Sequence, residues 1–88
     1  MLDLKRLRLL HELQMRGSLA AVADALNYSP SAVSQNLTLL EQEAGVALLR
    51  RAGRGVRLTP IGERLAARAD ELLETMERTE AELHANDD

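Results

Sequence analysis

The sequence predicts a mainly α fold: a winged helix-turn-helix of three helices and a two-stranded wing, followed by a long dimerisation helix. Capping residues divide the chain into four helical segments. Between the third and fourth segments lies a short arginine-rich stretch that alternates as a β-hairpin does. Leu, Val, Ile and Ala must build the core, because the 88 residues include one Tyr and no Phe or Trp. This composition favours helices over strands.

Residues that cap helices mark the first three segments, which we expect at 4–16, 19–26 and 30–44. The expected N-caps, whose side chains can accept hydrogen bonds from backbone amides, are Asp3, Ser18 and Ser29. The expected terminating residues, which tolerate a left-handed backbone, are Gly17, Asn27 and Gly45. Apolar residues recur at helical spacing in the second and third segments: Leu19, Val22, Ala23, Leu26 and then Val33, Leu37, Leu40, Ala44.

Residues 48–58 are expected to form a small β-hairpin with its turn at 52–55, where Gly53 and Gly55 can both adopt positive φ. Thr59 and Pro60 then combine a capping residue with a proline, and a helix is expected from about Ile61 to His84. The chain is therefore divided into a winged helix-turn-helix head at 2–59, a long helix at 60–85 and a disordered tail at 86–88.

The overall net charge of −3 averages two unlike parts. Residues 1–60 carry eight Lys and Arg against five Asp and Glu, a net charge of +3, whereas residues 61–88 carry three against nine, a net charge of −6. A basic head can face phosphates while the acidic helix stays away from them. The lack of cysteine excludes disulfides and thiolate metal sites and fits a reducing cytoplasm. No apolar run approaches the roughly 20 residues of a membrane span, and the N-terminus does not resemble a signal peptide.

The outer face of the third helix carries only uncharged hydrogen-bonding side chains in its first half: Ser31, Ser34, Gln35 and Thr38, with Asn36 at its border. A helix that enters the major groove of DNA with its N-terminus first needs such a face. The backbone amides at the start of this helix also suit a phosphate. The alternative is an ordinary polar surface turned to water.

Four arginines fall within eight residues of the hairpin, at positions 50, 51, 54 and 57, and Arg54 lies between two glycines at the tip. A slim loop that presents one arginine can reach a phosphate or a narrow minor groove. The alternative is a charged edge that deters aggregation.

Residues of the long helix recur at heptad-like spacing, which predicts a seam for a partner helix and hence a homodimer. The seam consists of Ile61, Leu65, Ala69, Leu72, Met76, Thr79 and Leu83. The alternative is that this helix packs back on the head.

Nothing in the sequence favours an enzyme, a cofactor or a metal. His11 and His84 have no third ligand spaced to join either of them. The acidic residues Asp70, Glu71 and Glu74 are interpreted as a solvated helix face rather than catalytic carboxylates. Tyr28, in the turn between the second and third helices, is expected to fill the core beneath the third helix.

Along nearly its whole length the sequence resembles the N-terminal region of LysR-type transcriptional regulators. The resemblance is carried by the stretches LDLKRLRLL, GSLAAVADALNYSPSAVSQNLTLLEQEAGVALLRR and AGRGVRLTPIGERL. It implies a winged helix-turn-helix that dimerises through its linker helix, in a cytoplasmic bacterial regulator that binds double-stranded promoter DNA. That family usually carries a C-terminal domain that senses a small-molecule effector, and the chain stops before it.

The resemblance places the DNA contacts at the start of the third helix and in the wing. With the cap of the second helix, the expected DNA-binding residues are Ser18, Ser29, Pro30, Ser31, Ser34, Gln35, Thr38, Arg51 and Arg54. The chain departs from the family pattern at Pro30-Ser31, where Gln-Pro is common, and at Gln35, where arginine is common. The departure at Gln35 removes a cation from the outer face of the third helix, which is expected to contact the bases.

Two other functions are compatible with the sequence. One is a winged-helix regulator of another family, and the other is a protein-interaction module that uses the acidic long helix. The basic, arginine-tipped hairpin argues against the interaction module.

Overall fold

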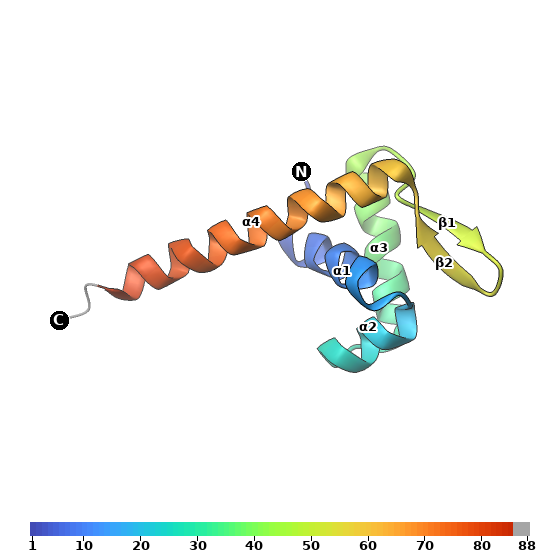
Figure 1. Cartoon of the computed structure of the whole chain (residues 1–88), viewed down its shortest axis with the longest axis horizontal. Helices are drawn as coiled ribbons and strands as arrows, with labels where there is room; N and C mark the ends of the chain where they lie inside the picture. Colours follow the sequence, from blue (N-terminus) through green and yellow to red (C-terminus); the bar gives the residue numbers. More distant parts are fainter. Residues whose placement is uncertain (86–88) are drawn as a thin grey trace.

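The computed structural model describes residues 1–85, and the expected tail at 86–88 lies outside the described residues. The elements follow in the order α1 (Leu4–Arg16), α2 (Leu19–Leu26), α3 (Pro30–Ala44), β1 (Leu49–Ala52), β2 (Gly55–Leu58) and α4 (Pro60–Ala85). Figure 1 shows α4 crossing over α1 and continuing well beyond the head, while the hairpin projects from the other end. This architecture is the mainly helical winged helix-turn-helix with a long helix that the sequence predicts.

Capping explains where the first three helices begin and end, as predicted. The Asp3 carboxylate accepts hydrogen bonds from the first amides of α1, and the hydroxyls of Ser18 and Ser29 each accept one, at 3.1 Å, from an amide of the following helix. The residues that follow the three helices adopt left-handed backbone conformations: Gly17, Asn27 and Gly45, with φ of 87°, 62° and 74°.

The wing is a two-stranded antiparallel hairpin whose register pairs Leu49 with Leu58 and Ala52 with Gly55. Of the two turn glycines that are free to adopt positive φ, one does so. Gly53 has a φ of 61°, but Gly55 is the first residue of β2 and its φ is not positive. The turn needs only one left-handed residue, because Gly55 already belongs to the strand ladder.

One hydrophobic core joins the head and the first half of α4. Leucines of α1 form its centre and side chains of α2, α3, the wing entry and α4 surround them: Leu7, Leu9, Leu10, Leu13, Val22, Ala23, Val33, Leu37, Leu40, Leu48, Ala66 and Ala69. The expectation that Tyr28 fills this core is wrong, because its side chain is 40% exposed. Leucine and valine already fill the space beneath α3, and Tyr28 lies in a surface turn.

The junction between the head, the wing and α4 is a network of backbone contacts. The Leu48 carbonyl accepts a 2.9 Å hydrogen bond from the Thr59 amide, and the Thr59 hydroxyl donates to the Ala47 carbonyl at 2.8 Å. The same hydroxyl accepts from the Gly62 amide at 3.1 Å and so caps α4. A Cβ on Gly62 would overlap the Leu48 carbonyl oxygen. Only glycine allows α4 to approach the wing entry this closely.

Gly62→Ala should therefore destabilise the protein. Elsewhere inside a helix, the same change ordinarily raises the free energy of unfolding by as much as about 1 kcal/mol. The clash with backbone atoms should instead cost about 1–3 kcal/mol, the usual range for overpacking. Urea unfolding at fixed protein concentration measures the difference. Gly55→Ala is the matched control, because a Cβ there would approach only the Ala52 carbonyl, at 3.9 Å. A loss no larger than that of the control would mean that α4 can shift without cost.

Candidate nucleic-acid interface

The outward face of α3 is a strip of exposed, uncharged hydrogen-bonding side chains. Ser31, Ser34, Gln35 and Thr38 are all exposed, and they lie opposite the buried Val33, Leu37 and Leu40. The spacings of three, one and three residues keep the four on one side of the helix. The structure therefore brings together the α3 residues that the sequence selected, on a surface that carries no formal charge.

Two capping serines begin the helices of this face. The Ser18 hydroxyl accepts from the Ala21 amide and the Ser29 hydroxyl from the Ala32 amide, while both side chains remain exposed. Each hydroxyl still has its own O–H to donate. Pro30, at the first position of α3, is exposed beside Ser29. The first turns of α2 and α3 thus present backbone amides and hydroxyls, the groups that bind anions at helix N-termini.

The residue at the border of the strip has an internal role. The Asn36 side chain donates to the Ala32 carbonyl at 2.8 Å and accepts from the Arg6 guanidinium at 3.3 Å. The Arg6 guanidinium also pairs with the Glu43 carboxylate, whose other oxygen accepts from the Asp3 amide at 3.2 Å. These contacts tie α1 to α3, so Asn36 and Arg6 hold the strip in place rather than belonging to it.

A second acidic residue of α3 orients the wing. One oxygen of the Glu41 carboxylate accepts hydrogen bonds from the amides of Leu48 and Leu49, at 2.8 and 3.0 Å. This role is not predictable from the sequence, because a glutamate late in a helix resembles a solvent-facing residue. The contact fixes the first strand of the wing relative to α3.

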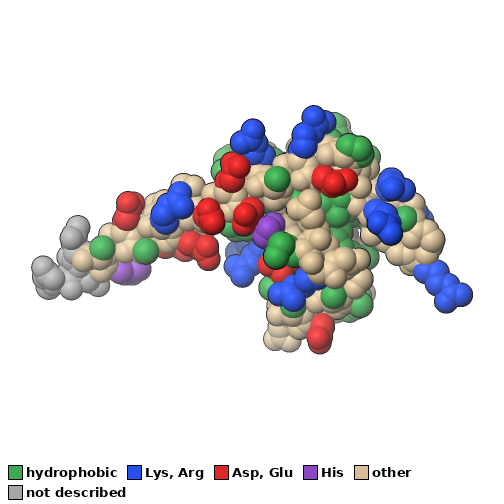
Figure 2. Space-filling view, viewed as in Figure 1, with side chains coloured by type: hydrophobic (Ala, Val, Ile, Leu, Met, Phe, Trp, Pro, Cys, Tyr) green, Lys and Arg blue, Asp and Glu red, His purple; other side chains and the backbone are tan. Residues whose placement is uncertain are grey.

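The wing arginines divide between its two faces. Arg54 occupies the turn, Arg51 pairs in register with Val56, and Arg50 lies directly opposite Arg57. All four side chains are exposed. Figure 2 shows the resulting cluster of basic side chains at the wing, while acidic side chains follow α4. Arg50 and Arg57 were not among the expected DNA contacts, because the face of each arginine depends on a strand register that the sequence leaves open.

Five of the predicted seam residues on α4 are exposed: Thr79, and the apolar Ile61, Leu72, Met76 and Leu83, at 41%, 48%, 42% and 74%. Leu65 is partly buried against the core. The assignment of Ala69 to the seam is corrected, because Ala69 is fully buried within the chain. It belongs with Gly62 and Ala66 to a small-residue face that packs on the head. The first half of α4 thus packs back on the head, while residues 74–85 are exposed throughout.

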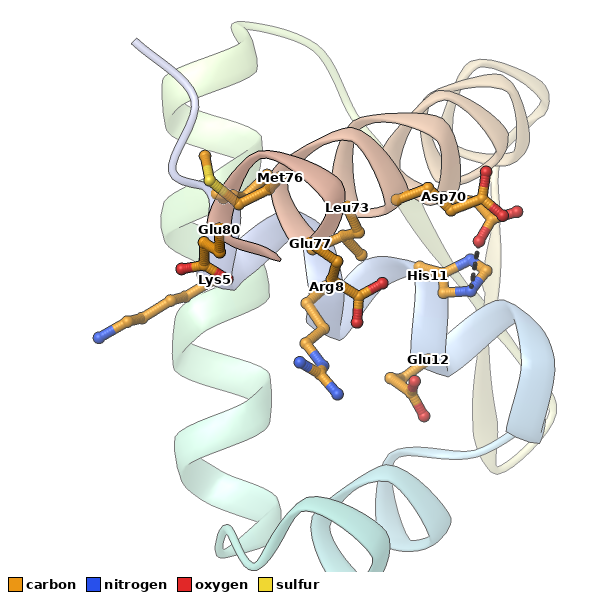
Figure 3. Close-up of a pocket in the computed structure, with 11 residues that line it drawn as sticks. Lys5, Arg8, His11, Glu12, Asp70, Leu73, Met76, Glu77 and Glu80 are labelled. Atoms are coloured by element: carbon orange, nitrogen blue, oxygen red, sulfur yellow. Dashed lines mark ion pairs between the residues drawn. The ribbon is translucent and has the colours of Figure 1, made fainter. Parts of the chain in front are cut away.

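A cleft lined mainly by charged side chains runs along the surface where α1 and α4 meet. Figure 3 shows His11 of α1 and Asp70 of α4 pointing toward one another across it, with 3.5 Å between the His11 Nε2 and the Asp70 Oδ1. Within residues 1–85 the other ring nitrogen of His11 is buried without a hydrogen-bond partner. No group of three or more metal-ligating side chains occurs in the described part of the chain. No helix between residues 1 and 85 combines the length and apolarity needed to cross a membrane.

The family profile described as "Bacterial regulatory helix-turn-helix protein, lysR family" matches residues 4–63. The chain belongs to the LysR family. The alternative of a winged-helix regulator from another family is therefore wrong. The probable HTH-type transcriptional regulator YhaJ of Escherichia coli is 40% identical over 83 residues, which make up 92% of this chain and 28% of YhaJ. This LysR-type chain therefore spans less than a third of the length of such curated relatives, which are transcriptional regulators rather than enzymes.

Solved structures of LysR regulators have the same fold. Full-length OxyR from Pseudomonas aeruginosa matches all of this chain over 30% of its own length, with a TM-score of 0.90 and 29% identity. A CbnR DBD–DNA complex matches 99% of this chain over its full length, with a TM-score of 0.90 and 28% identity. The LysR-type chain described here is thus similar to a domain that has been crystallised with DNA.

Arg54→Ala should weaken binding to specific and random DNA alike, because a guanidinium at the tip of a glycine turn contacts phosphate or the minor groove rather than base edges in the major groove. If Arg54 neutralises one phosphate, the slope of log affinity against log salt should fall by about one unit. Anisotropy titrations of a labelled duplex at several salt concentrations measure this slope. An unchanged affinity and slope would rule out a contact by the wing tip.

Proposed function

We propose that this LysR-type chain binds double-stranded promoter DNA sequence-specifically, as the DNA-binding part of a bacterial transcription regulator. The observation that carries the proposal is the uncharged hydrogen-bonding strip on α3, which part-buried hydrogen bonds hold against α1, in a head that also carries an arginine-rich wing. Similarity to a domain crystallised with DNA supports it. A regulator of this kind acts in the cytoplasm and needs no catalytic residue or cofactor, and a small-molecule effector would act through a separate C-terminal domain.

Within this proposal the exposed residues have three roles. Ser31, Ser34, Gln35 and Thr38 read base edges in the major groove, where an amide side chain can pair with the N6 and N7 edge of adenine. Ser18, Ser29 and Pro30 place helix N-termini against phosphates, which fixes the register of α3 on the duplex. Arg51 and Arg54 of the wing add sequence-independent affinity.

The exposed stripe on α4 is proposed as the dimer interface. Its apolar residues are Ile61, Leu65, Leu72, Met76 and Leu83, which extend past the end of the head. Residues 71–85 carry five glutamates and one arginine, so two such segments side by side would repel one another. An antiparallel pair avoids this repulsion, because it places each acidic segment beside Arg64 and Arg68 of the partner subunit. Leu72 lies midway between Ile61 and Leu83, and it would therefore lie near the two-fold axis.

Gln35→Ala should relax sequence preference while leaving binding to random DNA nearly intact. A good bidentate pair with adenine discriminates against other bases by about 1–3 kcal/mol, whereas phosphate contacts are indifferent to sequence. Competition between a selected duplex and a random duplex measures the sequence preference, which is the ratio of the two affinities. Asn36→Ala is the control, since its contacts are internal: it should lower stability and both affinities together. Equal losses on both duplexes for Gln35→Ala would mean that Gln35 positions the backbone instead.

Leu72→Arg should make the protein monomeric at micromolar concentration, because a charge in the seam would be buried without a partner. DNA affinity should then fall sharply, since contact with the second half-site is no longer intramolecular. Ala67→Arg adds the same charge on the opposite side of α4 and should remain dimeric. Sedimentation velocity distinguishes the two variants. A wild-type monomer, or a Leu72→Arg dimer, would contradict the proposed interface.

A further inference from the structure

One face of the wing places two like charges directly opposite one another. The antiparallel register pairs Arg50 of β1 with Arg57 of β2, and both side chains are exposed. Directly opposed residues have Cβ atoms about 4.5–5.5 Å apart, and like charges in such a pair destabilise a hairpin. Across residues 1–85 neither guanidinium takes part in an ion pair with an acidic side chain. The hairpin therefore forms despite a repulsion that an anion between the two guanidinium groups would relieve.

This face of the wing forms one wall of a groove. The opposite wall is the corner between α1 and α2, which includes Gln14 and Ser18. Arg50, Arg54 and Arg57 all line the groove, and its one acidic residue is Glu63 of α4. Arg51 lies on the other face of β1 and is not part of the lining. Three of the four wing arginines thus converge on a single concave surface beside the N-terminus of α2.

We propose that Arg50 and Arg57 clamp one phosphodiester of the DNA backbone in this groove, a contact that rests on the proposed function. Each guanidinium carries a planar fork of N–H donors, the feature by which arginine binds phosphate oxygens strongly. The Ser18 hydroxyl and the first amides of α2 border the same groove and add uncharged donors. The contacts expected in the wing were Arg51 and Arg54, and the clamp adds the pair that the strand register brings directly opposite one another.

The clamp has an unusual consequence for stability. A residue that only supports the fold destabilises the protein when it is replaced. Arg57 should behave oppositely, because its removal relieves repulsion in the free protein and removes a phosphate contact in the complex. DNA affinity and thermal stability should therefore change in opposite directions, or affinity should fall while stability stays constant.

Arg57→Glu tests this, because it converts the like-charge pair with Arg50 into a cross-strand pair of opposite charges. Its melting temperature without DNA should equal or exceed that of the wild type, while affinity for a random-sequence duplex at low salt should fall tenfold or more. The salt slope should fall by about one unit. Lys5→Glu, with the same charge change at an exposed position of α1 outside the groove, should lose much less affinity.

Arg57→Thr is the second variant, in case a glutamate beside Glu63 disturbs the groove. Threonine favours a strand and is uncharged, so this protein should fold and lose one unit of salt slope. Binding of the wild type to the duplex distinguishes failure of the clamp from failure of the proposed function. If the wild type binds and both Arg57 variants bind as Lys5→Glu does, the clamp is wrong and the proposed function stands. If the wild type does not bind DNA at low salt, the proposed function itself fails.

Discussion

The head, the wing and the long helix are held in one arrangement by the close approach of Gly62 to the Leu48 carbonyl. Thr59 reinforces this approach with three hydrogen bonds, which join the end of β2, the segment before β1 and the first turn of α4. Glu41 fixes the same segment from the side of α3. Because Gly62, Leu48 and Thr59 meet through backbone atoms and one short side chain, little conformational freedom remains there. The wing and α3 are therefore presented to a ligand as one surface.

The two faces of α4 differ in residue size and in exposure. Glycine and alanine on one face let the helix lie close against α1, and Ala66 and Ala69 are fully buried there. Larger apolar residues on the adjacent face are exposed, and they extend past the head along a segment rich in glutamate. The same helix can thus be held rigidly against its own head while its exposed apolar residues remain available to pack against a second copy. The charge division along the chain keeps its acidic end away from the surface that would face phosphates.

Most of the fold was predictable because its boundaries are marked by residues with strong local preferences. Asp3, Ser18 and Ser29 cap where expected, and three residues with left-handed backbones end the helices. The errors concern features that depend on tertiary packing. Alanine fits a partner seam and a tightly packed face equally well, so the pattern could not decide which of them Ala69 occupies. A tyrosine in a turn between two helices fits the core and the surface equally well, and here leucines already fill the space beneath α3.

The candidate site was predictable on α3 and less so in the wing. A helix of known phase places Ser31, Ser34, Gln35 and Thr38 on one side. A strand changes face with every residue, so the directions of four clustered arginines depend on a register that the sequence does not specify. The supporting roles of Arg6, Asn36 and Glu41 were also hidden, because each contact joins segments distant in the chain.

Selection of bound sequences from a random duplex library examines specific recognition by α3 and dimeric binding through α4 in one experiment. We expect enrichment of an inverted repeat whose half-sites are about one helical turn, roughly 10 base pairs, or a multiple of it apart. A library recovered without any enriched sequence would contradict recognition by α3. Enrichment of a single, unrepeated half-site would contradict pairing through α4.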